Sequence, residues 1–394
     1  MDFDNIFKES KIFDNREVLS PHYLPDELPF RDKQINEIIK SLTPALRGER
    51  GRNLFIYGKT GTGKTSCIKY VINKITQLNE IKARVSYINC RIYNSRFRVF
   101  NKIASDHLPL YSKRGFGVID IYEKLINFIE VDGKTLIVVL DEIDMIKDLD
   151  DTIYTLTRIN SDISKGGITI VGISNKISFK DNLDPRSLST LYENEIVFPP
   201  YNSEELSFIL KARATKAFKP NVIDDGIINF VSAIAAKESG DARLALKILS
   251  KAGEIADEKD QDKITQDDVV EAAKYAEEDI AYELISTLPE QERLILYAIA
   301  TLAIEGSKYK RLTSDNEDYV LSGEIYDRYV RIAQSMGKEP KSDRWYRKFI
   351  VDLEMQGLIT SMPSSKGIKG HTKLIKLLYP ADKVKTVLDK GFGA

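Results

Sequence analysis

Cysteine, tryptophan and histidine are scarce in this chain. The low counts of cysteine and histidine exclude several classes of protein. The 394 residues include two cysteines, one tryptophan and three histidines. Two cysteines are too few for a disulfide framework or a zinc module, and the histidines lie too far apart in the sequence to form a metal-ligand pattern. We expect both cysteines, Cys67 and Cys90, to be small buried apolar residues.

Long apolar runs and a large net charge are also absent. No run approaches the roughly 20 apolar residues of a membrane span, and the start Met1-Asp2-Phe3-Asp4 is unlike a signal peptide. We therefore expect a cytoplasmic protein that contacts no membrane. The net charge is −1, so any basic surface must be local. The chain is too long for one hydrophobic core and is expected to form two or three domains.

A glycine-rich run is the strongest motif that the sequence contains. Gly58-Lys59-Thr60-Gly61-Thr62-Gly63-Lys64-Thr65 follows the apolar stretch 54–57 and precedes a stretch of helical periodicity, 66–77. A strand, a glycine-rich turn and a helix in this order are typical of a phosphate-binding loop, whose N–H groups surround phosphate oxygens. Lys64 would reach the β- and γ-phosphates of a nucleotide, and Thr65 would hold Mg²⁺. The backbone around the phosphates would come from Gly58, Thr60, Gly61, Thr62 and Gly63.

A pair of acids at the end of a buried strand supports this interpretation. The continuous apolar run 136–140 is typical of a strand covered on both faces of a parallel sheet, and Asp141 and Glu142 follow it. Ligands bind at this edge of α/β sheets. Asp141 is expected to hold Mg²⁺, and Glu142 is expected to orient or deprotonate the attacking water.

Three further polar residues are candidates for sensing the nucleotide. Asn175 ends the strand pattern 168–173 and could bond the attacking water and the γ-phosphate, or it could simply cap a turn. Arg186 could reach a nucleotide held by a neighbouring subunit, or it could form a surface ion pair. Arg243 opens a helix and could fold back on the phosphates, or it could be an ordinary solvated arginine.

The hydrophobic pattern changes twice along the chain. Residues 1–20 are expected to form an extended arm that leads into the first domain. Residues 21–200 alternate between helical and strand patterns, which predicts a parallel sheet with helices on both faces. Residues 201–285 show only helical periodicity, with predicted N-caps at Asn202, Asp241 and Thr265.

Residues 286–394 read as three helices followed by a β-hairpin with a basic tip, a winged helix-turn-helix. Nine Lys or Arg residues stand against four acids between Lys338 and Lys376, so this segment forms a basic patch in a nearly neutral chain. The recognition helix is expected at 342–356, and its N-terminal half would face base edges. The candidate DNA contacts are Arg344, Arg347 and Lys348 on this helix, Lys341 just ahead of it, and Ser365, Lys366, Lys369 and His371 in the wing. Trp345 is expected in the core beside Phe349. A winged helix used only for protein contact is the alternative.

These motifs, in this order, resemble the AAA+ ATPases. More narrowly, the chain resembles the archaeal replication initiators related to the largest origin recognition complex subunit and to the cell-division-cycle loader. The resemblance covers essentially the whole chain. It rests on Leu24-Pro25-Asp26-Glu27-Leu28-Pro29-Phe30-Arg31, residues 58–65, residues 141–144, Asn175, Asp184-Pro185-Arg186, residues 196–201, Gly240-Asp241-Ala242-Arg243 and the terminal winged helix.

The resemblance implies a fold and a function. The fold would be α/β, an AAA+ P-loop parallel-sheet domain followed by a small all-helical lid domain and a winged-helix domain. ATP or ADP with Mg²⁺ would bind between the first two domains, and hydrolysis would be slow and regulatory. The partners would be double-stranded origin DNA, the MCM helicase and, through Arg186, a second copy or a paralogue. The protein would be associated with the chromosome.

Family membership also implies roles for particular residues. Leu24, Pro25, Arg31 and Tyr201 would enclose the adenine. The segment 91–98 resembles an insertion that touches origin DNA, with contacts from Arg96 and Arg98. From the residues alone, these arginines interleaved with Tyr93 and Phe97 suit phosphate contact, but a solvated helix with core aromatics is equally compatible.

Two other functions remain open at this point. A clamp-loader-like or chaperone-like remodeller would turn over ATP on a protein substrate and bind DNA with little salt dependence, whereas an initiator should show a steep salt slope. An ATP-regulated transcription factor would share the DNA-binding domain and differ mainly in the sites that it occupies.

Overall fold

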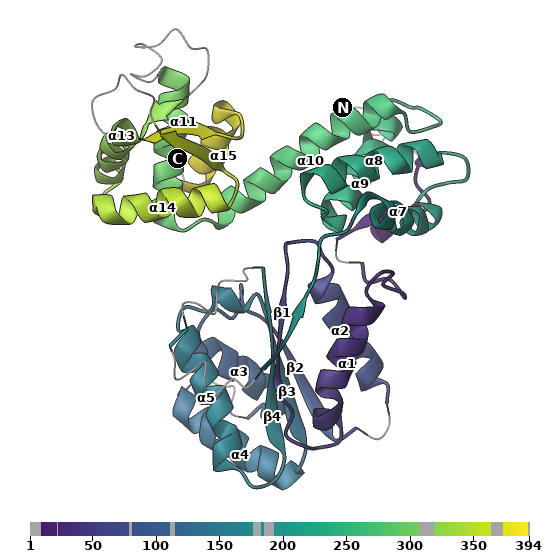
Figure 1. The fold of residues 1–394 in the computed structure, drawn as a ribbon, viewed down its shortest axis with the longest axis vertical. Coiled ribbons are helices and arrows are strands. Elements are labelled where there is room, and N and C mark those ends of the chain that lie inside the picture. Colours follow the sequence, from purple (N-terminus) through teal and green to yellow (C-terminus); the bar gives the residue numbers. More distant parts are fainter. Residues whose placement is uncertain are drawn as a thin grey trace. The chain divides into compact units, whose positions relative to one another are not determined.

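The chain folds into two compact units, Met1–Ala272 and Ala273–Ala394. The structure is a computed structural model (Figure 1). It describes residues 9–21, 23–78, 81–110, 115–175, 183–184, 193–306, 319–363 and 373–392. Among these residues, no helix combines the length and the apolar character of a membrane span.

A five-stranded parallel sheet forms the centre of the first unit (Figure 1). The strands lie in the order β2 (Ala83–Asn89), β3 (Thr135–Asp141), β4 (Gly167–Ser174), β1 (Asn53–Tyr57) and β5 (Glu193–Val197). The three central strands are buried along their whole length. Both faces of such a sheet must be covered, which explains the continuous apolar runs in the sequence.

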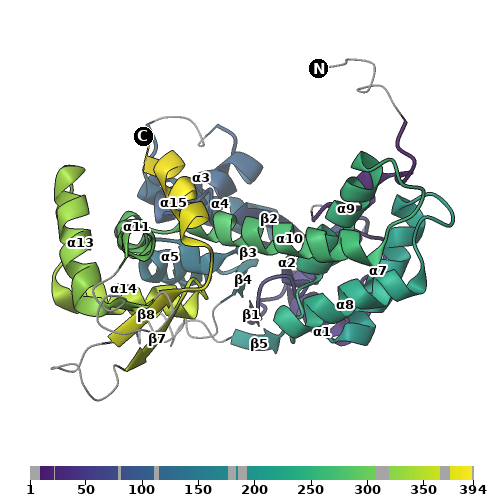
Figure 2. The same cartoon turned by 90° about the horizontal axis from the view of Figure 1, so that it is seen from above.

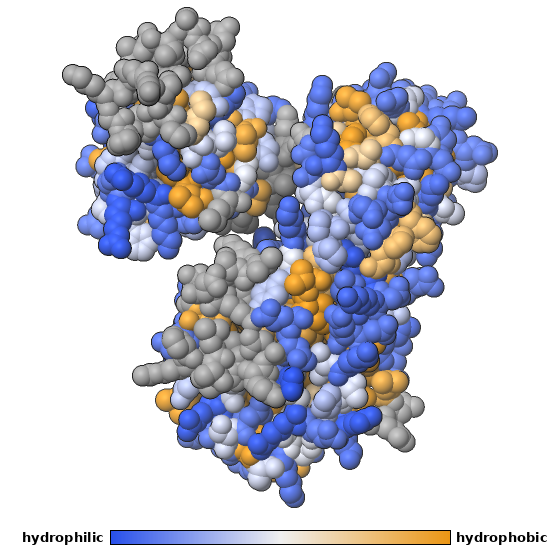
Figure 3. Space-filling model, in the orientation of Figure 1, coloured by the Kyte–Doolittle hydropathy of each residue, from blue (hydrophilic) through white to orange (hydrophobic). Residues whose placement is uncertain are grey.

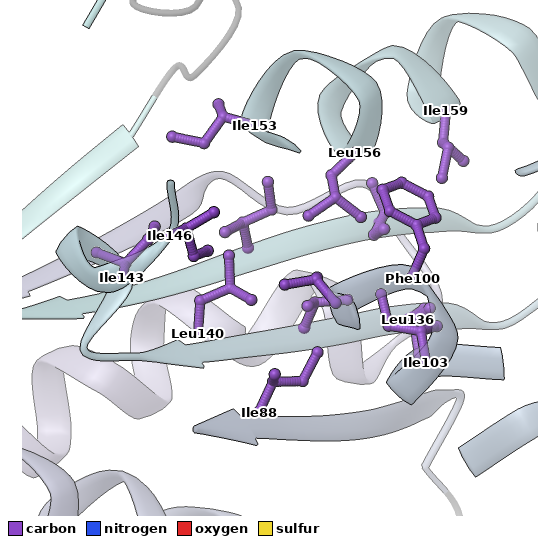
Figure 4. Packing of buried hydrophobic residues seen from close by; sticks show 14 of the residues in the cluster. Ile88, Phe100, Ile103, Leu136, Leu140, Ile143, Ile146, Ile153, Leu156 and Ile159 are labelled. Atoms are coloured by element: carbon purple, nitrogen blue, oxygen red, sulfur yellow. The ribbon is translucent and has the colours of Figure 1, made fainter. Parts of the chain in front are cut away.

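Helices cover the two faces of the sheet (Figure 1). One face carries α3 (Arg96–His107), α4 (Val118–Asp132) and α5 (Leu149–Asp162), and the other carries α1 (Asp32–Leu46) and α2 (Lys64–Thr76). Figure 4 shows the first core, where Leu136 and Leu140 of β3 point toward Phe100 of α3 and Leu156 of α5. Cys90 is buried in this core and Cys67 in the opposite one, as predicted.

Four helices follow the sheet and form the lid: α7 (Ser203–Ala217), α8 (Asp225–Glu238), α9 (Ala242–Glu258) and the start of α10 (Gln266–Thr287). The predicted N-caps are present. The Asn202 side chain accepts from the Glu205 N–H at 2.9 Å, and the Asp241 carboxylate accepts from the Arg243 N–H at 2.7 Å. Thr265 accepts from the Asp268 N–H at 3.3 Å. These side chains satisfy N–H groups that have no partner within their helices.

The N-terminal segment packs on the lid, which the sequence pattern does not predict. Ile12, Val18 and Leu19 are buried, and residues 16–19 form a short 3₁₀ helix against α7 and α9. The Phe13 and Phe218 rings lie 5.2 Å apart. The expectation of an extended arm that only leads into the α/β domain is therefore wrong for this segment, because its apolar side chains gain burial on the lid.

The second unit contains a winged helix (Figure 2). Helices α11 (Glu290–Glu305), α13 (Ser322–Ser335) and α14 (Asp343–Met355) precede the hairpin strands β7 (Ile359–Pro363) and β8 (Lys373–Leu377), and α15 (Ala381–Phe392) follows them. A short strand, β6 (Val320–Leu321), completes an antiparallel sheet in the order β6-β8-β7. Strand β6 and helix α15 were not predicted from the sequence, and their buried residues Val320, Val384 and Leu388 belong to the common core.

Candidate nucleotide and DNA sites

A cavity of about 400 Å³ lies at the carboxyl end of the sheet, between the phosphate-binding loop, the lid and residues 20–29. Ten of the predicted nucleotide-site residues line it: Pro25, Gly61, Gly63, Lys64, Thr65, Asp141, Glu142, Asn175, Tyr201 and Arg243. Five others do not line the cavity: Leu24, Arg31, Gly58, Thr60 and Thr62. The topology thus brings together residues from distant parts of the sequence at the edge where α/β proteins bind ligands.

The phosphate-binding loop is pressed against the lid and the segment after β5. Gly61 and Gly63 have φ angles of +69° and +91°, which L side chains rarely adopt. A Cβ at Gly61 would lie 1.4 Å from Oδ1 of Asp241, and one at Gly63 would lie 2.9 Å from the hydroxyl of Tyr201. The Ala242 N–H donates to the Gly61 carbonyl at 3.2 Å. The loop and the first turn of α9 are therefore in direct contact.

Lys64 is buried at the start of α2. Its ammonium donates to the carbonyl oxygens of Gly58 and Lys59, at 2.7 Å each. Burial, and after it the charge of Arg243, lowers the pKa of Lys64 to about 8. Two cations therefore face the same cavity, where an anionic ligand would relieve their repulsion.

Thr65 and Asp141 meet at the junction of α2 and β3. The Thr65 hydroxyl donates to Oδ2 of Asp141 at 3.0 Å, and the Tyr87 hydroxyl donates to the same oxygen. Hydroxyl and carboxylate oxygens are the ligands that Mg²⁺ prefers, so this pair fits the predicted metal site. Tyr87 was not predicted, because a tyrosine in strand β2 carries no local signal for this contact.

Glu142 has an unusual backbone and an ion-pair partner that the sequence reading missed. Its φ is +57°, a left-handed conformation that is costly for a residue with a side chain. Its carboxylate pairs with the guanidinium of Arg91, which follows the end of β2. Arg91 therefore holds Glu142, whereas Asp141 is held by Thr65.

Arg31 is a buried cation, with only 2% of its surface exposed. Its guanidinium donates to the carbonyl oxygens of Thr62 and Pro199, at 2.9 and 2.8 Å, and lies 3.7 Å from the centre of the Tyr201 ring. Arg31 thereby lies behind Tyr201 and supports the phosphate-binding loop from outside the cavity. Leu24 is likewise not a lining residue, whereas Pro25 and Tyr201 face the cavity.

The predicted sensing residues have different surroundings. Asn175 follows β4, half-buried, and Arg243 is exposed on the first turn of α9. The neighbouring Ser174 hydroxyl donates to Asp144 at 2.9 Å. Arg186 lies outside the described residues, as do Ser365, Lys366, Lys369 and His371 of the wing.

Arg213 of α7 lines the cavity and was not predicted. It donates to the carbonyl oxygens of Val18 and Tyr23, at 2.9 and 3.3 Å, and its guanidinium lies 4.5 Å from the centre of the Tyr23 ring. Burial lowers its pKa. Arg213 thus ties the N-terminal segment to the lid.

The segment 91–98, which ends in the first turn of α3, contains arginines that contact other polar side chains. The Arg96 guanidinium is 3.8 Å from Asp151, and the Arg98 guanidinium donates to Asn94 at 3.3 Å. Phe97 is exposed, whereas Tyr93 packs partly against the sheet core. The two aromatic residues therefore have different environments.

The α14 helix presents a basic surface at its N-terminal half, in line with the hydrophilic residues over α14 in Figure 3. Lys341, Arg344 and Lys348 are exposed, and their side chains pair with no carboxylate of the described residues. The Arg347 guanidinium is 2.7 Å from Asp343. Trp345 is 51% exposed, so its predicted place in the core is wrong. Tyr346, one residue on, fills the core position instead.

Comparisons with known proteins agree with this architecture. The family descriptions "AAA ATPase domain", "Cdc6 AAA+ ATPase-type lid domain" and "CDC6, C terminal winged helix domain" match residues 27–161, 207–274 and 283–387. The chain is thus an AAA+ ATPase-type protein with a lid and a winged helix.

More specific relatives are also found. "ORC1-type DNA replication protein" of Pyrococcus abyssi is 39% identical, over 98% of this chain and 92% of the relative, and that of Thermococcus kodakarensis is 41% identical, over the same shares. The Aeropyrum pernix ORC1 protein, solved in complex with DNA, has a TM-score of 0.76 and 34% identity, covering 97% of this chain and 98% of the other. The chain belongs to the family of ORC1-type DNA replication proteins.

Proposed function

We propose that this protein is an ATP-switched initiator that binds duplex DNA at replication origins and recruits the MCM helicase. The observation that carries the proposal is that one chain contains both a candidate nucleotide site and a candidate DNA-binding site. A cavity suited to a nucleotide is bordered by lid residues that touch the phosphate-binding loop, and a winged helix presents exposed basic side chains on its recognition helix. The DNA-bound ORC1 relative supports the DNA half.

The residues around the cavity have distinct roles in this proposal. Gly61, Gly63 and Lys64 bind the phosphates, Pro25 and Tyr201 face the base, and Arg31 holds the loop in place. Thr65 and Asp141 would hold Mg²⁺, which supplies charge neutralisation at the phosphates. Asn175 and Arg243 respond to the γ-phosphate, so the lid position depends on the nucleotide.

The ion pair of Glu142 supports the proposal that hydrolysis is slow. A carboxylate that is paired with Arg91 is less available to accept a proton from water, so the basal rate should be low. Arg186 would complete the site of a second copy or a paralogue. The resulting long-lived ATP state suits a switch better than a motor.

The DNA contacts would come from both units. Lys341, Arg344, Arg347 and Lys348 of the winged helix would face the groove and its phosphates, and Ser365, Lys366, Lys369 and His371 would extend the contact through the wing. Arg96 and Arg98 would add phosphate contacts. Such a protein would reside on the chromosome.

The deciding experiment is footprinting of the purified protein across its own genomic DNA, with and without ATP. Protection confined to replication origins, and bound MCM in pull-downs that depends on ATP, would support the proposal. Protection spread over promoters would favour a transcription factor, and no protection with fast ATP turnover would favour a remodeller.

A variant pair tests the winged helix directly. Replacing both Arg344 and Arg347 with Ala should weaken duplex binding and lower the salt slope by about two. The matched control replaces Lys33 and Lys40, both exposed on α1, with Ala. Equal binding by wild type and the Arg344 and Arg347 variant would refute DNA recognition by α14.

A further inference from the structure

Trp345 is placed for contact rather than for packing. It is the third residue of α14 and the single tryptophan of the chain, and 51% of its surface is exposed. The core side of α14 is filled by Tyr346, Ile350 and Leu353, which are all buried. A large aromatic side chain left half in solvent is a common feature of recognition surfaces.

Basic side chains surround Trp345. Arg344 precedes it, and Lys348 lies one turn further on, with its ammonium 5.3 Å from the centre of the indole ring. Lys341 is exposed just before the N-cap of α14, Ser342. The Phe349 ring is stacked at 6.1 Å and limits the movement of the indole. The surface is therefore an ordered apolar group flanked by exposed basic residues.

This chemistry matches duplex DNA. The side chains of Lys341, Arg344 and Lys348 have no carboxylate partner among the described residues and are available to phosphates. N-terminal residues of a recognition helix meet base edges in the major groove, where the apolar group on offer is the thymine methyl. An acidic protein partner would satisfy the cations but gives no reason for the apolar group at their centre.

We propose that Trp345 is a specificity-determining residue that packs on thymine methyl groups in the major groove. The inference rests on the proposed DNA-binding function and adds a direct base contact to it. Arg344 and Lys348 would bind the flanking phosphates and hold the indole in the groove. The contact is apolar, so it should contribute affinity that does not depend on salt.

The test uses the full-length protein and a duplex taken from its footprinted site, with binding followed by the anisotropy of labelled DNA. Tryptophan emission should change on binding and become protected from acrylamide, and a scrambled duplex should cause a smaller change. Trp345→Ala should weaken binding about tenfold with an unchanged salt slope. Tyr154→Ala, which removes an exposed aromatic residue on α5, should bind like wild type.

Replacing single thymines by uracil removes only the methyl group. At one or more positions of the site, wild type should lose about fourfold in affinity, and Trp345→Ala should lose nothing further there. Duplex binding with unchanged tryptophan emission and equal affinity of the alanine variant would overturn this inference alone. Failure of wild type to bind any duplex would overturn the proposed function together with it. Thermal melting of each variant verifies that the fold is retained.

Discussion

The carboxylate of Asp241 lies directly against Gly61, so that a methyl group on Gly61 would overlap its Oδ1 at 1.4 Å. Asp241 also caps α9 through the Arg243 N–H, and the next residue, Ala242, donates to the Gly61 carbonyl. Burial raises the pKa of this carboxyl. The helix that carries Arg243 is therefore positioned by the phosphate-binding loop itself, and nucleotide binding at the loop has a short physical route to the lid.

Gly61→Ala should separate the loop from the lid. We expect ATP affinity to fall by at least about tenfold, because α9 must move to admit the methyl group and a left-handed alanine costs about 1–2 kcal/mol. Titration with a fluorescent ATP analogue measures the loss. Gly133→Ala is the matched control, since Gly133 has a similar φ of +62° with nothing within 4 Å of the added Cβ. Equal ATP affinity in both variants would contradict the contact.

ATP binding should take up protons above about pH 8. The pKa of Lys64 is lowered to about 8 by burial and Arg243, and bound phosphates would raise it. Affinity should therefore be constant below this pH and fall as the pH rises through it. Calorimetry in two buffers of different ionisation enthalpy counts the protons, and Lys64→Arg should abolish the uptake. Equal heats in the two buffers at about pH 9 would argue against a lowered pKa.

The same shift affects folding. The folded pKa of Lys64 lies below its ordinary value, so the folded state binds fewer protons above about pH 8. Without nucleotide, this group should make the free energy of unfolding rise with pH from about 8 to about 10.5, and contribute no slope below that range. Urea titrations of wild type and Lys64→Met over this range would isolate the contribution.

Arg91→Ala should raise basal ATP hydrolysis severalfold. The substitution removes the cation that holds the Glu142 carboxylate, so the carboxylate becomes free to accept a proton from water. Glu142→Gln should abolish hydrolysis while ATP still binds. Arg158→Ala, which removes an exposed pair with Asp162 on α5, should leave the rate unchanged. A lower rate in the Arg91 variant would mean that Arg91 instead assists the reaction.

Arg31→Lys should destabilise the protein by about 2–4 kcal/mol, because one ammonium cannot replace the buried, planar contacts to Thr62, Pro199 and the Tyr201 ring. Chemical denaturation of the α/β unit measures the effect. Arg84→Lys is the control. Arg84 forms an ion pair with Asp132 at a partly exposed site, where such a pair contributes less than about 1 kcal/mol to the free energy of unfolding. Similar midpoints for the two variants would show that Arg31 has no structural role.

The sequence was informative where chemistry depends on local spacing. Lys64 and Thr65 sit side by side in one motif, and Asp141 ends an apolar run that a parallel sheet requires. The order of the strands then brings these residues together. The winged helix was likewise predictable, because three stretches with helical periodicity precede two short stretches with a strand pattern.

Contacts between distant, unpatterned residues could not be predicted. Arg91 reaches Glu142 from another strand end, and Arg213 reaches Val18 from the lid. Trp345 was misplaced because helical spacing gives a residue's face only approximately, and the neighbouring Tyr346 took the buried position. Arg186 lies outside the described residues, so its role at the nucleotide of a neighbouring subunit stays a prediction.

The strand order also has a consequence for synthesis of the protein. Strand β1, which leads into the phosphate-binding loop, is hydrogen-bonded on one side to β4 and on the other to β5, where Leu54 lies opposite Val171 and Asn194. Both neighbouring strands are translated long after β1. Strand β1 therefore cannot complete its hydrogen bonds, and the loop cannot be held in place, until the residues up to Val197 have left the ribosome. A nascent chain of this protein should thus acquire nucleotide affinity late and abruptly.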